Sequence, residues 1–534
     1  SVNDYLQRTI DFLLSEKEME RSIDIDEYEQ ALRFVLHFVL FLDSIYDMDA
    51  DDNTPHDSNA KCYQSIILPR RNELILAYLG QLMGQKPLWE FTCLYASLLP
   101  TDLAINACTE FWLVSVVQEE DRRMILKHAR DNFREGMDLV ILRNVVRSSI
   151  AMSAEDADSL GISSLPGLPD LPMFSAKKGE RLNPALEDSI AHNDVRKMHS
   201  IRWLCINDQH YAHALVFSNM LLRKMLLESA SLNAPFSSYD KLDDWTQDSK
   251  VYSAKVFLSR FIPADFIRAT NDIIESKSFH EIYKATTESF CVEHQALVQL
   301  LDAHDSYEIW KEVISQVSPC STFAPDTRFE ANGTMENEVA MNMEKMSYMK
   351  RKRQNVRKVL QVASIARDDI LRMLDGGWLS DVDTSVEAIS GDEDFSTRRE
   401  EVELLRRSCL PTFVFLAFRI LYDTGLWIDE FVKDIKDIFD EEEGNIILHR
   451  IYSADCRTDG EGDKEMNTLL LSTTWYHDTL LLANIVSSTS NGIVINMTKE
   501  QVAELQAKFA DTSIRLMLAV QEGVPKNYRN SLNC

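Results

Sequence analysis

Apolar residues recur three or four positions apart along most of this chain, a spacing that places them on one side of an α-helix. Alternating apolar and polar positions, which would indicate half-buried strands, are few. These patterns predict an all-α fold, an elongated and irregular stack of helices that follows no fixed repeat period. The predicted helices cover residues 5–14, 31–42, 72–82, 88–98, 102–118, 290–301, 309–317 and 345–374.

The most apolar stretch of the chain is Leu404–Trp427. In the central part of this stretch the polar residues Thr412, Arg419 and Asp423 form a single line along one side of the helix. A helix that is apolar on nearly every side is either buried in a helical core or covered by another protein. Arg419 and the lack of a long uninterrupted apolar run argue against a membrane span. We predict that this stretch is the internal spine of a C-terminal bundle and that its helix stops at Gly425.

Breaks in the helical pattern divide the chain into blocks. We expect an N-terminal helical block (1–150), a flexible insertion (151–198), a middle helical block (199–317), a loose linker (318–344) and a C-terminal tail bundle (345–534) with acidic inserts at 391–397 and 440–466. Clustered glycine and proline predict the insertion, and runs of acidic residues predict the solvated inserts. Because the chain begins at Ser1 without a methionine, we also expect it to be part of a longer protein.

The last predicted helix has well-marked ends. Thr498 precedes the apolar pattern and Gln501 follows three residues later, which together form a capping box. Gly523 is placed to end the helix. Its predicted apolar face consists of Val502, Leu505, Phe509, Leu516 and Val520. A terminal helix specified in this way is expected to be held firmly in place rather than frayed.

Composition narrows the classes of function. The chain carries 56 Lys and Arg against 85 Asp and Glu, a net charge of −29, which opposes direct binding to nucleic acid or to an anionic membrane surface. Its nine cysteines occur singly, without a C-x-x-C pair, as is typical of proteins from a reducing compartment. No signal peptide is evident.

The sharpest enzyme hypothesis rests on Asp43 and Asp47, which resemble the magnesium-binding aspartates of class I terpene synthases. That motif needs adjacent carboxylates, but Ser44 follows Asp43, and neither Asn207 nor Asn271 begins a complete companion motif. A calcium loop over Asp47–Asp52 lacks the required glycine. The sequence therefore predicts no enzyme, and it indicates no metal or cofactor site.

Two further features have ordinary structural interpretations. His210 and His213 are spaced to share a metal, but no third ligand accompanies them, so they are expected to be packed or surface histidines. The basic cluster Lys350–Lys358 could be a nuclear-import signal or a dock for an acidic partner. We favour the solvated side of a helix, because Val356, Leu360 and Ile365 continue the helical pattern through it.

Five segments in a fixed order carry a family resemblance: Ala31–Leu42, Leu99–Ala104, Asp375–Val382, Leu404–Pro411 and Leu482–Ser488. From about residue 31 onward the chain resembles the C-terminal part of the nucleoporin-107 family (nucleoporin-84 in yeasts), which belongs to the Y-shaped scaffold complex of the nuclear pore. The resemblance implies an α-solenoid-like, coatomer-like stack without enzymatic activity, located at the nuclear envelope and supporting pore assembly, mRNA export and protein import.

The resemblance also implies partners. The C-terminal tail is expected to bind the helical tail of nucleoporin-133, which carries a β-propeller. The family's N-terminal half, expected to be largely missing from this chain, meets nucleoporin-96 (145C in yeasts). We predict that the groove formed by residues 469–486 and 502–520 receives the partner, through Trp475, Leu481, Asn484, Ile485, Leu505, Phe509 and Leu516. A different coat-like or tethering scaffold is the runner-up hypothesis.

Overall fold

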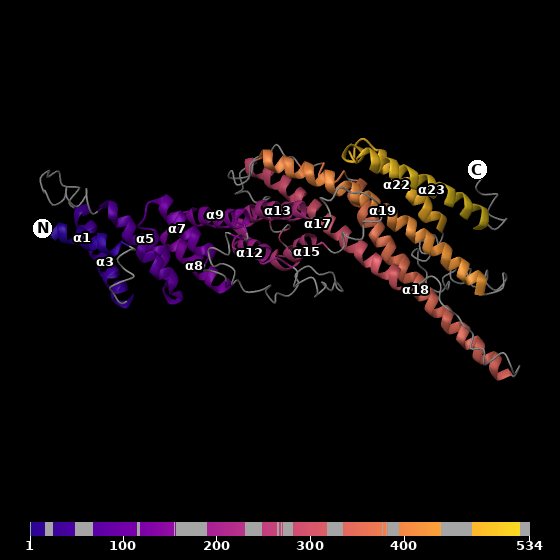
Figure 1. Ribbon diagram of the computed structural model, residues 1–534, viewed down its shortest axis with the longest axis horizontal. Coiled ribbons are helices and arrows are strands. Elements are labelled where there is room, and N and C mark those ends of the chain that lie inside the picture. Colours follow the sequence, from indigo (N-terminus) through magenta and orange to yellow (C-terminus); the bar gives the residue numbers. More distant parts are fainter. Residues whose placement is uncertain are drawn as a thin grey trace. The chain divides into compact units, whose positions relative to one another are not determined.

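The computed structural model describes residues 2–15, 25–48, 68–114, 118–153, 155, 190–229, 248–263, 266, 268, 270, 281–317, 335–375, 377–380, 382, 395–438 and 472–523. In these residues every regular element is a helix, so the all-α prediction is confirmed (Figure 1). The chain forms two compact units. Unit 1 contains Ser1–Ala176, Ala191–Phe217 and Arg260–Thr270, and unit 2 contains Lys177–Ile190, Ser218–Ser259 and Asn271–Cys534. The predicted middle block, 199–317, is therefore shared between the two units.

Unit 1 is built from short helices. They are α1 (Val2–Leu13), α3 (Ile25–Met48), α5 (Leu68–Gly84), α6 (Trp89–Ala96), α7 (Thr101–Val114), α8 (Glu119–Asn132), α9 (Met137–Ala151), α12 (His192–Ile201) and the start of α13 (Tyr211–Glu228), with short 3-10 turns at Lys86–Leu88, Leu204–Ile206 and Asp208–His210. Each helix packs mainly on the next helix or the next but one along the chain. This produces an irregular stack of helices with local contacts.

Aromatic residues and one buried arginine fill the end of this stack. Trp112 of α7 stacks on Trp203, with ring centroids 5.3 Å apart. The Arg122 guanidinium lies 5.0 Å from the Trp203 ring, and its Nη1 donates to the His199 carbonyl at 2.8 Å. Burial, followed by the charge of Arg202, lowers the pKa of Arg122 to about 9. The cation is held by the ring face and by a carbonyl dipole, as a buried arginine requires.

Unit 2 is built from longer helices. They are the rest of α13, α15 (Ser249–Val256), α17 (Glu281–Gln316), α18 (Met335–Asp375), α19 (Phe395–Ile438), α22 (Ser472–Ser487) and α23 (Lys499–Gly523), with a π-helical turn beginning at Phe257 and a 3-10 turn at Val494–Asn496. α17 packs on α18, α18 on α19, α19 on α22 and α22 on α23. In Figure 1, α22 and α23 lie side by side along α19.

Several helices begin or end away from their predicted positions. α17 is one helix where two were expected, because Ala303, His304 and Tyr307 face the interior and carry the apolar side through the polar segment between them. α18 begins at Met335, inside the predicted linker. α12 begins inside the predicted insertion 151–198, and α19 begins inside the first acidic insert, 391–397. The second acidic insert, 440–466, lies outside the described residues. The predicted end of helix 345–374 is confirmed, since α18 stops at Asp375 and Gly377 adopts a φ of +60°.

α19 does not stop at Gly425, so that prediction is wrong. The helix runs from Phe395 to Ile438 through both Pro411 and Gly425. A Cβ at Gly425 would lie 2.6 Å from Cε1 of Tyr476, so glycine is required there for the close approach of α22 rather than for a helix end. By length and composition one described helix, Ser396–Ile435, could cross a membrane, but 78% of its apolar window is buried inside the protein. That burial is expected of a core helix.

Candidate interaction surface

α22 is fixed to α19 by one continuous face. The residues of this face lie three or four positions apart and are buried: Trp475, Tyr476, Thr479, Leu482 and Val486. The Tyr476 ring covers Gly425, and its hydroxyl donates to Oδ2 of Asp429 at 2.6 Å. Burial and this hydrogen bond raise the pKa of Tyr476. Arg367 of α18 lies 5.4 Å from the Trp475 ring centroid and pairs with Asp478 at 3.1 Å. These contacts fix the rotation of α22 about its axis.

The first half of α23 is fixed in the same way. The predicted capping box is confirmed: the Thr498 amide donates to Oε1 of Gln501 at 2.8 Å, and the Gln501 amide donates to Oγ1 of Thr498 at 3.2 Å. Leu505 and Thr512 are buried, and the Phe509 ring lies 5.8 Å from the Phe418 ring of α19. This half of α23 therefore belongs to the packed bundle.

The second half of α23 exposes its apolar side chains. The exposed fractions are 58% for Ile514, 66% for Met517, 49% for Leu518 and 39% for Val520. Ile514, Met517 and Leu518 are spaced three and four residues apart, so they form one stripe along the helix. We call these four residues the α23 apolar end. An apolar stripe that the chain itself leaves exposed is typical of a surface that another protein covers.

The outer side of α22 and the turn before α23 expose further apolar residues. Leu481 is 44% exposed, Asn484 is exposed and Ile485 is half-buried. In the 3-10 turn, Val494 and Ile495 are 43% and 86% exposed. These residues belong to unit 2, as the α23 apolar end does. The C-terminal helices thus carry most of the exposed apolar side chains described in this unit.

The seven residues predicted to contact a partner fall into two groups. Trp475 and Leu505 are buried among the chain's own helices and have almost no surface to offer. Leu481 and Asn484 are exposed, and Ile485, Phe509 and Leu516 are partly exposed. The involvement of all seven residues in partner binding stays a prediction. Residues 469–471 of the predicted groove lie outside the described residues.

Three strongly exposed residues, Ile495, Met517 and Leu518, are not among the predicted contact residues. For Met517 and Leu518 the signal was present, because the last turns of α23 contain more apolar residues than the single predicted face includes. A face defined by helical period alone does not show which of two apolar sides the chain covers. That depends on where α19 and α22 lie.

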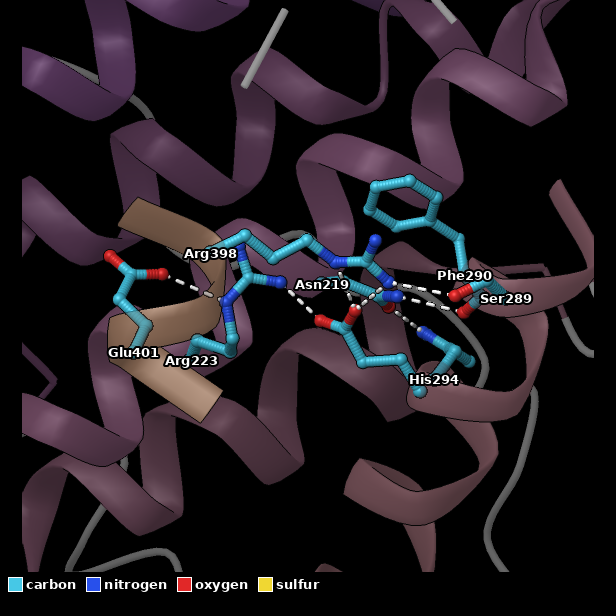
Figure 2. A network of polar contacts seen from close by, with 8 residues as sticks. Asn219, Arg223, Ser289, Phe290, His294, Arg398 and Glu401 are labelled. Atoms are coloured by element: carbon cyan, nitrogen blue, oxygen red, sulfur yellow. Dashed lines mark hydrogen bonds and ion pairs between the residues drawn. The ribbon is translucent and has the colours of Figure 1, made fainter. Parts of the chain in front are cut away.

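A buried network of charges fixes the start of α19 (Figure 2). Glu293 of α17 is fully buried and lies between two arginines, Arg223 of α13 and Arg398 of α19. The Arg398 Nη2 and Nε donate to the same Glu293 oxygen at 2.7 and 2.8 Å. The Arg223 Nε donates to Glu401 at 2.8 Å. One carboxylate therefore joins three helices that are distant in sequence.

The same network continues through neutral groups (Figure 2). Arg398 lies 3.7 Å from the Phe290 ring centroid and donates to the Ser289 hydroxyl at 3.2 Å. Asn219 donates to the Phe290 carbonyl at 2.8 Å, and its Oδ1 lies 2.8 Å from Nδ1 of His294. Burial lowers the pKa of His294 to about 4, so this histidine is neutral and its Nδ1 is the donor to Asn219. Because each of these buried polar side chains is bonded to another group of the protein, we interpret the network as structural rather than as a binding site.

Another group of side chains has the spacing of a metal site. Ligand atoms of His304, Asp305 and Glu308 on α17 lie within 4.8 Å of one another. The Lys255 ammonium of α15 lies 2.6 Å from Nδ1 of His304 and 2.7 Å from Glu308, and it also pairs with Asp305. Hydrogen bonds and charge from His304 and Lys255 outweigh burial and lower the pKa of Glu308 to about 2. The lysine occupies the position a cation would take, so the group is a salt-bridge cluster.

The remaining candidate sites do not assemble. Asp43 pairs with Arg71 at 2.9 Å, and the Asp47 side chain and the proposed calcium loop lie outside the described residues. His210 and His213 are both buried, and burial lowers the pKa of His210 to about 4. In the basic cluster, Lys352 is buried and donates to Asp434 at 2.6 Å, whereas Lys350, Arg351, Arg357 and Lys358 are exposed.

Comparison with known proteins supplies a family. The family model described as nuclear pore protein 84 / 107 matches residues 1–440. The proteins named Nuclear pore complex protein Nup107 from Homo sapiens and Mus musculus are each 23% identical to the chain, over 394 and 406 residues. Both alignments cover 74% of this chain and 35% of the relative, so the chain spans about a third of the length of these relatives. The family match ends before α22 and α23 begin.

Proposed function

The chain belongs to the nuclear pore protein 84 / 107 family and is a nuclear pore protein, and we propose that it is a structural scaffold that docks another nucleoporin through its C-terminal helices. The observation that carries the proposal is the α23 apolar end, Ile514, Met517, Leu518 and Val520, which lies on a helix whose first half is firmly packed. A rigid helix with an uncovered apolar stripe loses little conformational entropy when a partner binds.

The outer side of α22 extends this surface. Leu481 adds exposed apolar area on α22, which packs directly on α23, whereas Val494 and Ile495 are exposed in the turn that leads into α23, at the opposite end of this helix from the α23 apolar end. Full burial of one such side chain contributes roughly 1.5–3 kcal/mol. Several of them buried together provide the apolar centre of a specific interface, and Asn484 would lie on its polar rim.

We propose a helical segment as the partner, specifically the helical tail of nucleoporin-133. A helix laid beside α23 could pack its own apolar stripe against Ile514, Met517 and Leu518, as packed helices commonly do. The contact with nucleoporin-96, and the support of pore assembly, mRNA export and protein import, are proposed for the whole protein. In this role the chain acts by holding its neighbours in position and performs no catalysis.

Co-purification tests the docking surface. The double variant Met517→Glu/Leu518→Glu should reduce capture of the nucleoporin-133 tail by at least about 30-fold, because charges placed at an apolar interface centre remove the anchoring contacts. A matched control is Phe91→Glu/Leu94→Glu on α6, where the exposed fractions are 40% and 44%. The control should bind like wild type. Capture that survives the α23 double variant would refute this surface.

The choice of substitution matters at two predicted residues. Phe509 contacts Phe418, so replacing it also loosens α23 itself. Asn484 is exposed, and Asn484→Lys tests the surface without disturbing the packing. Circular dichroism should show unchanged helicity in every variant used. If binding is lost together with helicity, the result reports on folding and the variant is replaced.

Localisation tests the wider role. A fluorescent fusion of the chain should give a continuous nuclear rim in cells that contain its partners. The Met517→Glu/Leu518→Glu variant should weaken the rim signal, since it removes the proposed tail contact. Cytoplasmic puncta in place of a rim would point to a vesicle-coat or tethering scaffold and would contradict the proposal.

A further inference from the structure

A cavity on unit 1 differs in charge from the rest of this acidic chain. It has a volume of about 300 Å³ and lies against α8. Three cations line it, Arg123, Lys127 and Arg130, opposed by one carboxylate, Asp131. The chain as a whole carries a net charge of −29, so a cavity with an excess of positive charge is not a consequence of overall composition.

The three cations that line the cavity form an elongated row. Arg123, Lys127 and Arg130 lie four and three residues apart, so they form one row on α8. Seven residues of helix correspond to about 10 Å, which is the length of roughly three residues of extended peptide. A single small anion reaches only part of such a row. An extended chain with several negative groups can contact all of it.

The two arginines keep donors free for a ligand. Arg123 uses Nη2 to contact Glu119 at 2.6 Å, and Arg130 uses Nε to contact Asp138 at 3.3 Å. Each guanidinium has five N–H donors in total, so each retains others. Glu119 is also paired with Arg202 through its second oxygen, so one carboxylate is shared between two cations. The two arginine side chains are 66% and 48% exposed.

Lys127 is the best-placed cation. It is exposed, and among the residues that the structure describes it has no ion pair or hydrogen bond. The cavity also contains apolar surface, contributed by Leu126, which is buried, and by Ile206, which is half-buried. Cationic groups around an apolar floor suit a ligand that combines carboxylates with an apolar side chain.

We propose that this cavity docks an acidic peptide segment of another protein. Its carboxylates contact Arg123, Lys127 and Arg130, and one of its apolar side chains rests on Leu126 and Ile206. This site is separate from the α23 apolar end, and it does not depend on the function proposed for that surface. The attraction is between exposed charges, so it is weak and falls as the salt concentration rises.

A peptide-binding measurement tests the site. The probe is fluorescein-labelled Glu-Glu-Leu-Glu-Glu, followed by fluorescence polarisation at low ionic strength, with Gln-Gln-Leu-Gln-Gln as the uncharged comparison. The Arg123→Gln/Lys127→Gln/Arg130→Gln variant should bind the acidic probe about five- to tenfold more weakly. Lys127→Glu alone, at an exposed position without a described partner, should weaken binding without affecting folding.

The basic cluster of α18 supplies a matched control. Arg351→Gln/Arg357→Gln/Lys358→Gln removes the same number of exposed positive charges, and it should leave binding within about twofold of wild type. Equal losses in the two triple variants would mean that the probe responds only to total charge, and would overturn the proposal. Tighter binding of a single-stranded RNA probe, lost in the same α8 variant, would overturn it in favour of nucleic acid.

Chemical cross-linking locates the peptide directly. A carbodiimide joins a carboxylate of the bound peptide to a nearby lysine amine as an amide, with loss of water, and mass spectrometry identifies the lysine. Lys127 should give the dominant adduct. Lys350 and Lys358 are exposed and should react at least about fivefold less, because no cavity gathers the peptide there. Adducts spread equally over these three lysines would refute the site.

Discussion

α19 and α23 are both rich in apolar residues, yet those of α19 are buried and those near the end of α23 are exposed. In α19 every residue from Leu410 to Phe418 is buried, including Thr412, whose hydroxyl donates to the Ser408 carbonyl at 3.1 Å. In α23 the apolar residues after Thr512 are 39–66% exposed or partly exposed. α19 is covered by α18, α22 and α23, whereas the end of α23 has no described helix outside it. Helices of similar apolar content can thus be buried as a core or left exposed at the surface.

The buried charge network holds the start of α19 in place. Removing its central carboxylate should cause the largest loss of stability among the proposed variants. Glu293→Ala leaves Arg223 and Arg398 buried without their shared carboxylate. We expect a loss of about 3–5 kcal/mol in the free energy of unfolding, measured by urea denaturation. Arg399→Ala, at an exposed residue paired with Glu403, is the control and should change stability by less than about 0.5 kcal/mol.

A pair of identical substitutions compares the two helices directly. Leu416 of α19 is fully buried, and Leu416→Ala should destabilise the fold by about 2–5 kcal/mol, since it opens a cavity. Leu518 of α23 is 49% exposed, and Leu518→Ala should stay within about 0.5 kcal/mol. Urea denaturation of both variants provides the test. Similar losses for the two would remove the distinction between core and docking surface.

The buried histidine of the network gives the core a pH dependence. Burial lowers the pKa of His294 from its usual value of 6.5 to about 4, so between these two pH values mainly the unfolded chain binds the proton. Stability is therefore unaffected above pH 6.5 and falls as the pH drops from there towards 4. Between about pH 7 and about pH 5 this single group should remove about 2 kcal/mol.

Urea denaturation at a series of pH values measures this dependence. His294→Gln keeps an amide that can bond Asn219 and should flatten the curve in that window. His477, whose side chain is 61% exposed, is the control, and His477→Gln should leave the curve as in wild type. A His294→Gln curve that matches wild type would show that this histidine is not held neutral by the core.

The smallest effect is expected at the start of α23. Thr498→Ala removes the hydroxyl that accepts from the Gln501 amide and should destabilise the helix by about 1 kcal/mol. Because the effect is local, hydrogen exchange of the α23 amides is the appropriate measurement. Thr489→Ala, at an exposed position before the helix, is the matched control. Unchanged exchange in Thr498→Ala would mean that packing alone holds α23 in place.

Local features of this fold could be predicted from the sequence, and contacts between distant residues could not. The capping box of Thr498 and Gln501 depends on residues three apart, so it was readable directly. Gly425 looks like a helix stop in the sequence alone, because its actual role depends on Tyr476, about fifty positions away. Arg223, Glu293 and Arg398 are unremarkable in the sequence, and only folding brings them together. The burial of Trp475, which is predicted to contact a partner, likewise depends on distant residues such as Arg367 of α18.

Hydrogen exchange with and without the nucleoporin-133 tail is the most direct test of the proposed docking surface on α22 and α23. The chain should show new protection at the α23 apolar end, residues 514–520, and along the outer side of α22, residues 481–485. The amides of α19 should change little, because their side chains are already covered by the chain itself. Protection confined to other helices, with residues 514–520 exchanging as fast as in the free protein, would contradict the assignment of the docking surface.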